Sequence, residues 1–235
     1  SRGCDGSCRA REDPDAAGDR VKIGIVGGTG DIGEGMAMRL SQMHEVRLGS
    51  RDLSKAHEAS QECRLQVEGR GLPCSLGGCS NQEAVDFGDV VVLAIPFRHL
   101  VGTVESLSGL EGKIVISPIN PMEKREFFVY VPPEEGSAAV LVQRLLPGSR
   151  VVAAFNVIAA NRWKAIDEEL DYAVPICGDD AGAKQVVLEL IRTVPGLKGY
   201  DAGPLATACM VECITPLLLN VARYNRMHDV GIQFR

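Results

Sequence analysis

The chain has few aromatic side chains and no excess of positive charge. Of its 235 residues, 5% are aromatic, and the formal net charge is −6. Proteins that bind nucleic acid usually present a basic surface, often with aromatic side chains between the charges. No basic run or aromatic stripe of that kind occurs along this sequence. We therefore expect no nucleic-acid partner, and any bound anion must be held by a local site.

Long apolar runs are also missing. The longest, such as residues 90–97 and 214–219, are far shorter than the roughly 20 residues that a membrane helix needs. The first residues contain no apolar segment typical of a secretory signal. We therefore expect a cytoplasmic protein without a membrane partner. Hydrophobic residues make up 45% of the chain, which is enough for one sizeable core.

Cysteine is plentiful, but a disulfide scaffold is typical of short secreted chains, and this chain is long. We expect its eight cysteines to be reduced thiols. Cys209 and Cys213 lie four residues apart on an expected helix, yet no histidine or second cysteine pair accompanies them at zinc spacing. We therefore expect no metal site. Residues 1–20 lack periodicity and are rich in small and charged residues, which predicts a disordered tail.

An apolar run passes directly into a glycine-rich turn within residues 21–33. Gly28, Gly30 and Gly33 have the Gly-x-Gly-x-x-Gly spacing. In dinucleotide-binding proteins these glycines permit a tight turn, the approach of backbone N–H groups to a pyrophosphate, and close packing of helix on strand. The run before the turn predicts a buried strand, and residues 36–43 continue as a partly apolar helix. This context favours dinucleotide binding over a glycine-rich turn without a ligand.

The rest of the chain alternates strand and helix patterns, which is typical of a parallel sheet covered by helices. We predict an α/β fold with a Rossmann-type, doubly wound, mostly parallel sheet and a C-terminal helical lobe. Residues 21–157 are expected to form the dinucleotide-binding domain and residues 158–235 a smaller C-terminal region. Further strands are expected at 45–48, 72–76, 89–96, 113–117, 150–156 and 174–177. Helices are expected at 53–67, 137–146, 183–193 and 205–224, the last kinked at Pro216.

The end of the second strand bears on the choice between NAD and NADP. An acid about 20 residues past the glycines accepts from the ribose 2′-hydroxyl of NAD, whereas a 2′-phosphate needs arginine and hydroxyl donors. Ser50 and Arg51 stand at this strand end, Lys55 follows one helical turn later, and the first acid, Asp52, comes one place late. The pattern predicts NADP. The alternative is that Asp52 binds the ribose while Arg51 and Lys55 lie in solvent.

Groups for acid–base catalysis are scarce. A dehydrogenase that acts on an alcohol or hydroxy acid needs a histidine, lysine or tyrosine to move a proton. The four histidines occupy unrelated places, and no Tyr-x-x-x-Lys motif occurs. Two strands end in proline, at Pro96 and Pro118, which predicts a rigid apolar rim. Such a rim can hold two redox rings face to face, and we expect proximity and orientation to replace a catalytic side chain.

Several short motifs carry a resemblance to a known family. They are Gly27–Gly33, Gly49–Arg51 with Lys55, Ile95–Phe97, Val174–Asp180, Asp201–Leu205, and the ending from Thr215 through Asn225 to Ile232. With these motifs, nearly the whole chain resembles the F420-dependent NADP reductases of archaea and some bacteria. The resemblance implies hydride exchange between NADP and the 8-hydroxy-5-deazaflavin coenzyme F420. It also implies that residues 158–235 complete a cleft in which the deazaflavin stacks on the nicotinamide.

The same resemblance implies cofactor-binding residues. For the adenosine phosphates these are Gly28, Thr29, Gly30, Asp31, Ile32, Ser50, Arg51 and Lys55. Phe97, Val101, Met122 and Ala160 would line the nicotinamide side, and Ile158, Leu205 and Val230 would lie near the deazaflavin. The chain departs from the family pattern at three positions: Phe97 replaces a tryptophan, Asn156 a frequent histidine, and Ala159 a common proline.

Two other functions are compatible with the sequence. Residues 156–158 and 174–179 also resemble the cytosolic domain of STEAP metalloreductases, which use NADPH and a flavin and continue into membrane helices. An NADPH-dependent flavin or ferric reductase is therefore one alternative. A non-catalytic NADP redox sensor, with the apolar last helix as its partner surface, is the other. The same helix leads us to expect a homo-oligomer, most simply a homodimer.

Overall fold

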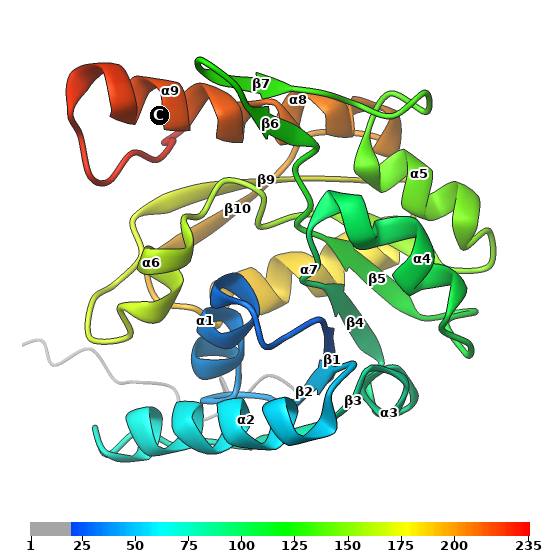
Figure 1. Ribbon diagram of the computed structural model, residues 1–235, viewed down its shortest axis with the longest axis vertical. Coiled ribbons are helices and arrows are strands. Elements are labelled where there is room, and N and C mark those ends of the chain that lie inside the picture. Colours follow the sequence, from blue (N-terminus) through cyan, green and yellow to red (C-terminus); the bar gives the residue numbers. More distant parts are fainter. Residues whose placement is uncertain (1–19) are drawn as a thin grey trace, which may run out of the picture.

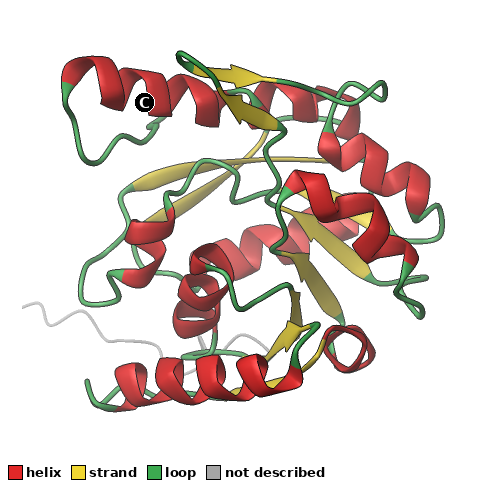
Figure 2. Ribbon diagram, in the orientation of Figure 1, coloured by secondary structure: helices red, strands yellow, loops and turns green. Residues whose placement is uncertain are grey.

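The computed structural model describes residues 20–235, which form an eight-stranded sheet with helices on both faces (Figure 1, Figure 2). The strand order is β10-β9-β8-β5-β4-β1-β2-β3. All neighbours pair in parallel except β8 and β9, which pair antiparallel. The predicted doubly wound, mostly parallel sheet is confirmed. The predicted disordered tail lies almost wholly outside the described residues.

The strands are short and mostly buried. Their bounds are β1 Lys22–Val26, β2 Glu45–Ser50, β3 Leu76–Ser80, β4 Val90–Leu93, β5 Ile114–Ser117, β8 Arg150–Ala153, β9 Tyr172–Gly178 and β10 Leu197–Asp201. Strands β4 and β5 are buried at every position because helices cover both faces of the sheet.

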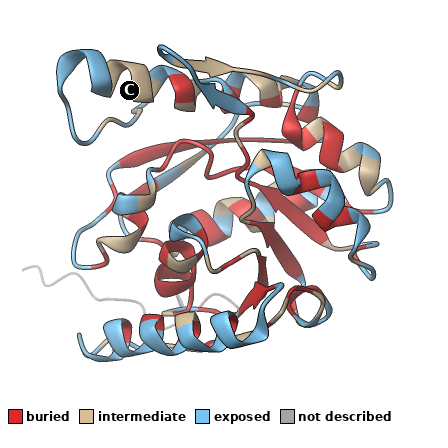
Figure 3. Ribbon diagram, in the orientation of Figure 1, coloured by how far each residue is buried: buried red, intermediate tan, exposed pale blue. Residues whose placement is uncertain are grey.

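The helices divide between two apolar clusters on opposite faces of the sheet. The central strands between them are buried (Figure 3). One face carries α1 Asp31–Leu40, α2 Leu53–Glu68, α6 Ala160–Lys164 and α7 Ala181–Arg192. The other carries α3 Asn81–Phe87, α4 Leu100–Glu105, α5 Ala138–Leu145 and α8 Ala208–Glu212. Alternating strand residues supply each cluster: Ile23 and Ile25 point to the first, and Val26 to the second.

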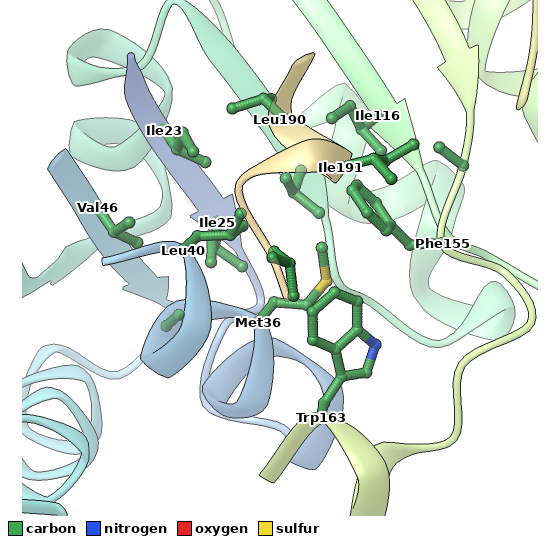
Figure 4. Close-up of a cluster of buried hydrophobic side chains, with 14 of the residues drawn as sticks. Ile23, Ile25, Met36, Leu40, Val46, Ile116, Phe155, Trp163, Leu190 and Ile191 are labelled. Atoms are coloured by element: carbon green, nitrogen blue, oxygen red, sulfur yellow. The ribbon is translucent and has the colours of Figure 1, made fainter. Parts of the chain in front are cut away.

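Helices α1 and α6 pack unusually closely. Trp163 of α6 is fully buried near Met36 of α1 (Figure 4), and its ring meets Phe155 edge-on at 5.6 Å between centroids. A Cβ atom at Gly35 would lie 2.4 Å from the Cβ of Trp163, so only glycine permits this approach. Buried Arg39 donates to four carbonyl oxygens at the end of α6 and just beyond it, at 2.6–3.0 Å.

The C-terminal helices form a separate layer with a two-stranded hairpin, at the top of Figure 1. This layer contains the turn η2 Leu205–Thr207, α8, α9 Ile214–Asn225, and the hairpin of β6 Met122–Lys124 and β7 Phe128–Tyr130. The side chain of Asn220 bonds both backbone groups of Phe128, accepting at 2.9 Å and donating at 2.8 Å. Helix α9 thereby holds the free edge of β7.

The helix predicted at 205–224 is divided just before Pro216. The helical run is interrupted at Cys213, between α8 and α9. Proline has no N–H group, and its ring crowds the carbonyl four residues earlier, which here belongs to Glu212.

Within the described part of the chain, Leu205–Asn225 is the helical segment long and apolar enough to cross a membrane. It has 21 residues and a mean hydropathy of 1.7, and 28% of its apolar window is buried. The expectation that no apolar run is long enough for a membrane helix rested on uninterrupted runs, and polar residues divide this segment. Length and composition are weak grounds for a membrane helix, since a helix in the core of a soluble protein meets the same criteria.

Three predicted strands have wrong bounds. The strand expected at 89–96 ends at Leu93. Strand β3 begins at Leu76 instead of residue 72, because Pro73 cannot donate to a sheet ladder. Gly78 then allows α2 to approach, since a Cβ there would lie 2.3 Å from the carbonyl oxygen of Ala56. The strand expected at 150–156 ends at Ala153, because Phe155 takes a left-handed conformation with φ 65° and turns its ring into the core.

Candidate functional site

Two adjoining cavities open at the carboxyl ends of the central strands. One has a volume of about 680 Å³ and the other about 590 Å³. Both reach Gly30 at the start of α1 and the loop after β4, including Pro96 and Arg98. In open α/β sheets this edge, where the strand order reverses between β1 and β4, is where ligands bind.

The glycine turn after β1 presents a row of free N–H groups to these cavities. The N–H of Gly27 donates to Asn81 Oδ1 at 3.0 Å, and that of Gly28 donates to the Gly49 carbonyl at 2.8 Å. The N–H groups of residues 31–33 have no acceptor within the helix, because they lie in the first turn of α1. A helix start of this kind binds anions.

The three motif glycines differ in what surrounds them. A Cβ at Gly28 would lie 2.7 Å from Leu48 Cγ, and one at Gly33 would lie 2.5 Å from the Gly28 carbonyl. At Gly30 a Cβ would meet only the Gly27 carbonyl, at 3.9 Å, and the φ of −93° suits any residue. The protein's own packing therefore leaves a space in front of Gly30, and this space fits the close approach of a pyrophosphate.

The smaller cavity is predominantly cationic. Its cations are Arg51, Lys55 and Arg98, and Asp52 is its one carboxylate. The other lining residues are Gly27, Thr29, Gly30, Ser50, Asn81, Ala94, Ile95, Pro96, His99 and Thr103. Asp52 is the N-cap of α2, and its carboxylate accepts from the N–H groups of Ser54 and Lys55 at 3.1 and 3.3 Å. Because Asp52 is engaged as a helix cap, Arg51 and Lys55 are left to face an anion.

The larger cavity is mostly apolar. Its walls are Leu93–Arg98 after β4, Pro118–Asn120 after β5, Met122 and Glu123 of β6, Ala160 of α6, and Gly30–Gly33. Both prolines of the predicted rim line it. Its two carboxylates are already paired: Asp31 with Lys164 at 2.7 Å, and Glu123 with Arg125 at 2.8 Å.

The structure gathers most of the predicted cofactor-binding residues at the cavity pair. Thr29, Ser50, Arg51 and Lys55 line the cationic cavity; Asp31, Ile32, Phe97, Met122 and Ala160 line the apolar one; Gly30 lines both. Five predicted residues line neither: Gly28, Val101, Ile158, Leu205 and Val230. Ile158 and Leu205 are almost fully buried, and Val101 is exposed on α4. The cofactor contacts of all these residues stay predictions.

Sequence reasoning missed Asn81, which is the first residue of α3. Its amide oxygen holds the glycine turn through Gly27, and α3 begins with a capping box between Ser80 and Glu83. The Ser-x-x-Glu spacing could have revealed this helix start. A second amide pair supports the apolar cavity: Asn156 donates to the Ile119 carbonyl at 3.1 Å, and Asn120 donates to the Asn156 carbonyl at 2.9 Å.

Within residues 20–235, no three histidine, cysteine, aspartate or glutamate side chains gather in a way that could hold a metal ion. The six cysteines in this range are free thiols. Burial raises the pKa of the Cys79 thiol to about 11, and that of Cys177 is raised for the same reason. These thiols are core side chains rather than nucleophiles.

Comparison with known proteins identifies the family. Residues 22–121 match the family model described as NADP oxidoreductase, coenzyme F420-dependent. The chain is 34% identical over 219 residues to the F420-dependent NADP reductase of Methanocaldococcus jannaschii, a match that covers 91% of this chain and 97% of that protein. The chain belongs to the F420-dependent NADP oxidoreductases. The predicted family, enzyme class and cofactor pair, NADP and coenzyme F420, are thereby confirmed.

Two further comparisons concern a solved structure and a longer protein. A candidate F420-dependent NADP reductase from Arthrobacter sp. FB24, known from its crystal structure, superposes with a TM-score of 0.75. The match covers 92% of this chain and 99% of that chain at 22% identity, which confirms the fold. Metalloreductase STEAP3 of Rattus norvegicus is 33% identical over 200 residues, covering 84% of this chain but 37% of that protein.

Proposed function

We propose that this protein transfers a hydride directly between NADP(H) and coenzyme F420. The proposal is supported above all by the junction of the two cavities at Gly30. The cationic cavity suits the 2′-phosphate end of NADP, the free N–H groups of the glycine turn suit its pyrophosphate, and the apolar cavity suits flat rings. When bound, the two coenzymes supply the redox chemistry themselves.

The protein's part is to bind the two coenzymes, to select NADP over NAD, and to orient the two rings. Ser50, Arg51 and Lys55 select NADP over NAD by charge-assisted hydrogen bonds to the 2′-phosphate. Pro96 and Pro118, on rigid loops after adjacent strands, limit how the rings can lie and exclude water. Residues 158–235 complete the acceptor end, and Ala160 from this region lines the apolar cavity.

No side chain acts as acid or base in this proposal. The titratable groups along the apolar cavity are Asp31, Arg98 and Glu123. Both carboxylates are committed to ion pairs, and a guanidinium does not release its proton near neutral pH. Orientation of the two rings therefore carries the rate enhancement, for which proximity alone can supply roughly 7 to 11 kcal/mol.

The test is a titration of purified protein with NADPH and oxidised F420. We expect the deazaflavin absorbance to bleach with one NADPH consumed per F420. If FMN or FAD is reduced instead while F420 is untouched, the protein is an NADPH-dependent flavin or ferric reductase, the function that the likeness to STEAP3 favours. Tight NADPH binding without turnover of any acceptor would make it a redox sensor.

We also propose a cytoplasmic homodimer in which α9 lies at the interface. The outward face of the C-terminal layer carries exposed apolar side chains, with Met210 67%, Leu217 60% and Tyr224 66% exposed. Light scattering after gel filtration tests the dimer, and Leu217→Glu should yield monomers. Partition of the expressed protein into the membrane fraction, followed by loss of that partition in the same variant, would instead indicate a membrane role for Leu205–Asn225.

A further inference from the structure

The first turn of α1 carries two carboxylates in the region assigned to the pyrophosphate. Asp31 is the first residue of the helix, lines the apolar cavity and is exposed, while Glu34 is half-buried one turn later. Acids favour a helix start when nothing else is bound there. A pyrophosphate on the same N–H groups would bring its negative charges close to the Asp31 carboxylate, and like charges at such range repel.

One cation neutralises both acids. The ammonium of Lys164, on α6, lies 2.7 Å from Asp31 Oδ1 and 2.7 Å from Glu34 Oε2. Its hydrogen bonds to the two carboxylates raise the pKa of Lys164, so it stays charged at any physiological pH. The two pairs bridge 133 and 130 positions of sequence, so no local pattern could have indicated them.

The backbone beneath Lys164 is held in place by the close contact between α1 and α6. Arg39 donates to the Trp163 carbonyl at 2.9 Å and to the Ala165 carbonyl at 2.6 Å, on either side of Lys164. Gly35 admits Trp163 against the helix. The ammonium is therefore fixed on the side of α1 that faces α6, and it draws the Asp31 carboxylate towards that side.

We propose that Lys164 is a positioning residue for dinucleotide binding, which cancels the charge of Asp31 and holds its carboxylate off the pyrophosphate. The inference rests on the NADP site of the proposed function. It also explains how an aspartate can occupy an anion site: the acid is tolerated because a lysine from the far part of the chain accompanies it. Through the same contact, Lys164 connects the pyrophosphate helix to α6, whose Ala160 lines the apolar cavity.

The experiment measures NADPH affinity by fluorescence titration without F420, in four proteins: wild type, Lys164→Met, Asp31→Asn and the double variant. We expect Lys164→Met to bind NADPH about tenfold more weakly at low salt and the loss to shrink to about threefold at 0.5 M salt. Asp31→Asn alone keeps the backbone N–H that faces the phosphates and removes only a charge that Lys164 already cancels, so it should change the affinity by less than about threefold. The double variant should recover to within about threefold of wild type, because the carboxylate that repels is gone.

A matched control is Lys184→Met, which breaks a comparable ion pair, with Asp201 at 2.8 Å, away from both cavities. This variant should bind NADPH as wild type does. A purely structural role for Lys164, or a direct bond from Lys164 to phosphate, predicts a loss that Asp31→Asn does not rescue, and that result would overturn the inference. If wild type itself fails to bind NADPH, the proposed function fails instead; if it binds and Lys164→Met binds equally well, only the inference fails.

Discussion

The two cavities share a wall at Gly30 but are built in opposite ways. The cationic one takes its selective groups from residues 50–55, which are consecutive at the end of β2 and the start of α2. The apolar one takes its walls from loops after β4 and β5, the hairpin and α6, which are far apart in sequence. The cationic cavity can discriminate between dinucleotides by a few charges on exposed side chains, whereas the apolar cavity can discriminate between ligands only by shape. Changes in the first should therefore alter which dinucleotide binds, and changes in the second how fast the hydride moves.

The largest effect is expected where the cavities meet. Gly30→Val fills the space in front of the glycine, and we expect NADPH affinity to fall by at least about 100-fold because the pyrophosphate loses its approach. Stability should fall by about 1 kcal/mol or less, since the site is open and its backbone conformation is ordinary. Titration and thermal melting measure the two effects. Gly30→Ala fills less of the space and should lose less NADPH affinity than Gly30→Val. Equal losses of NADPH affinity in the two variants, or unfolding of either, would contradict this assignment.

Selectivity should change at the cationic end. Arg51→Ala removes a charge-assisted hydrogen bond worth roughly 1.5 to 3 kcal/mol, so NADPH affinity should fall about 30-fold. NADH, which lacks the 2′-phosphate, should bind within about twofold of its wild-type affinity. The ratio of the two dissociation constants is the measurement. Equal losses for both dinucleotides would mean that Arg51 does not read the 2′-phosphate and that Asp52 takes the ribose.

The apolar end should respond in rate rather than in affinity. Phe97 lines only the apolar cavity, and Phe97→Ala leaves the rings freer to tilt out of alignment. We expect hydride transfer to F420 to slow by about tenfold, while NADPH affinity changes by less than about threefold. Single-turnover kinetics separate transfer from binding. Phe97→Trp restores the residue that the family resemblance leads us to expect, and a rate below that of wild type in this variant would count against the stacking assignment.

Replacement of Glu212 should have the smallest effect on activity. It should, however, clearly change how the stability depends on pH. This fully buried carboxylate accepts from the N–H groups of Ala138 and Ala139 at 2.9 and 3.0 Å and from the Tyr130 hydroxyl at 3.1 Å. Desolvation outweighs these bonds and raises the pKa of Glu212 to about 7. Since the unfolded carboxyl titrates near 4.5, wild-type stability should fall as pH rises from about 4.5 to about 7.

The pH dependence can be isolated with Glu212→Gln. The wild type should lose about 2.5 kcal/mol of unfolding free energy between pH 5 and pH 8 relative to the variant, which cannot titrate there. Urea unfolding at the two pH values gives the difference. Because glutamine also leaves a backbone N–H less well bonded, the comparison uses slopes with pH and not absolute stabilities. Parallel slopes would show that the carboxyl keeps an ordinary pKa.

The same contrast explains what could be predicted from the sequence. The glycine turn and residues 50–55 were predictable because their roles depend on residues that are close in sequence. The residue types themselves, glycine, serine and arginine, indicate the turn and the hydrogen bonds to an anion. The sheet was predictable where strands are continuous apolar runs, as at Val90–Leu93.

The rest depends on contacts that sequence patterns do not carry. Strand β3 has glycine at position 78 because α2 presses on it there, and with a second glycine at position 77 the strand shows no apolar alternation. The turn at Phe155 is left-handed without a glycine, which no propensity rule anticipates. The hairpin wall at Met122 exists because Asn220, about a hundred residues later, occupies the edge of β7. These features arise from packing between distant segments, and only the folded chain shows them.

The bonds from Asn220 to Phe128 have a consequence for the order of synthesis. A nascent chain that has left the ribosome as far as β8 already contains the glycine turn and the strands on either side of it. It also contains the residues at the end of β2 and the start of α2 that select the dinucleotide. Its hairpin, however, has no edge partner until the final helices leave the exit tunnel. The Met122 wall of the apolar cavity is thus completed only after the glycine turn and the residues that select the dinucleotide have been synthesised.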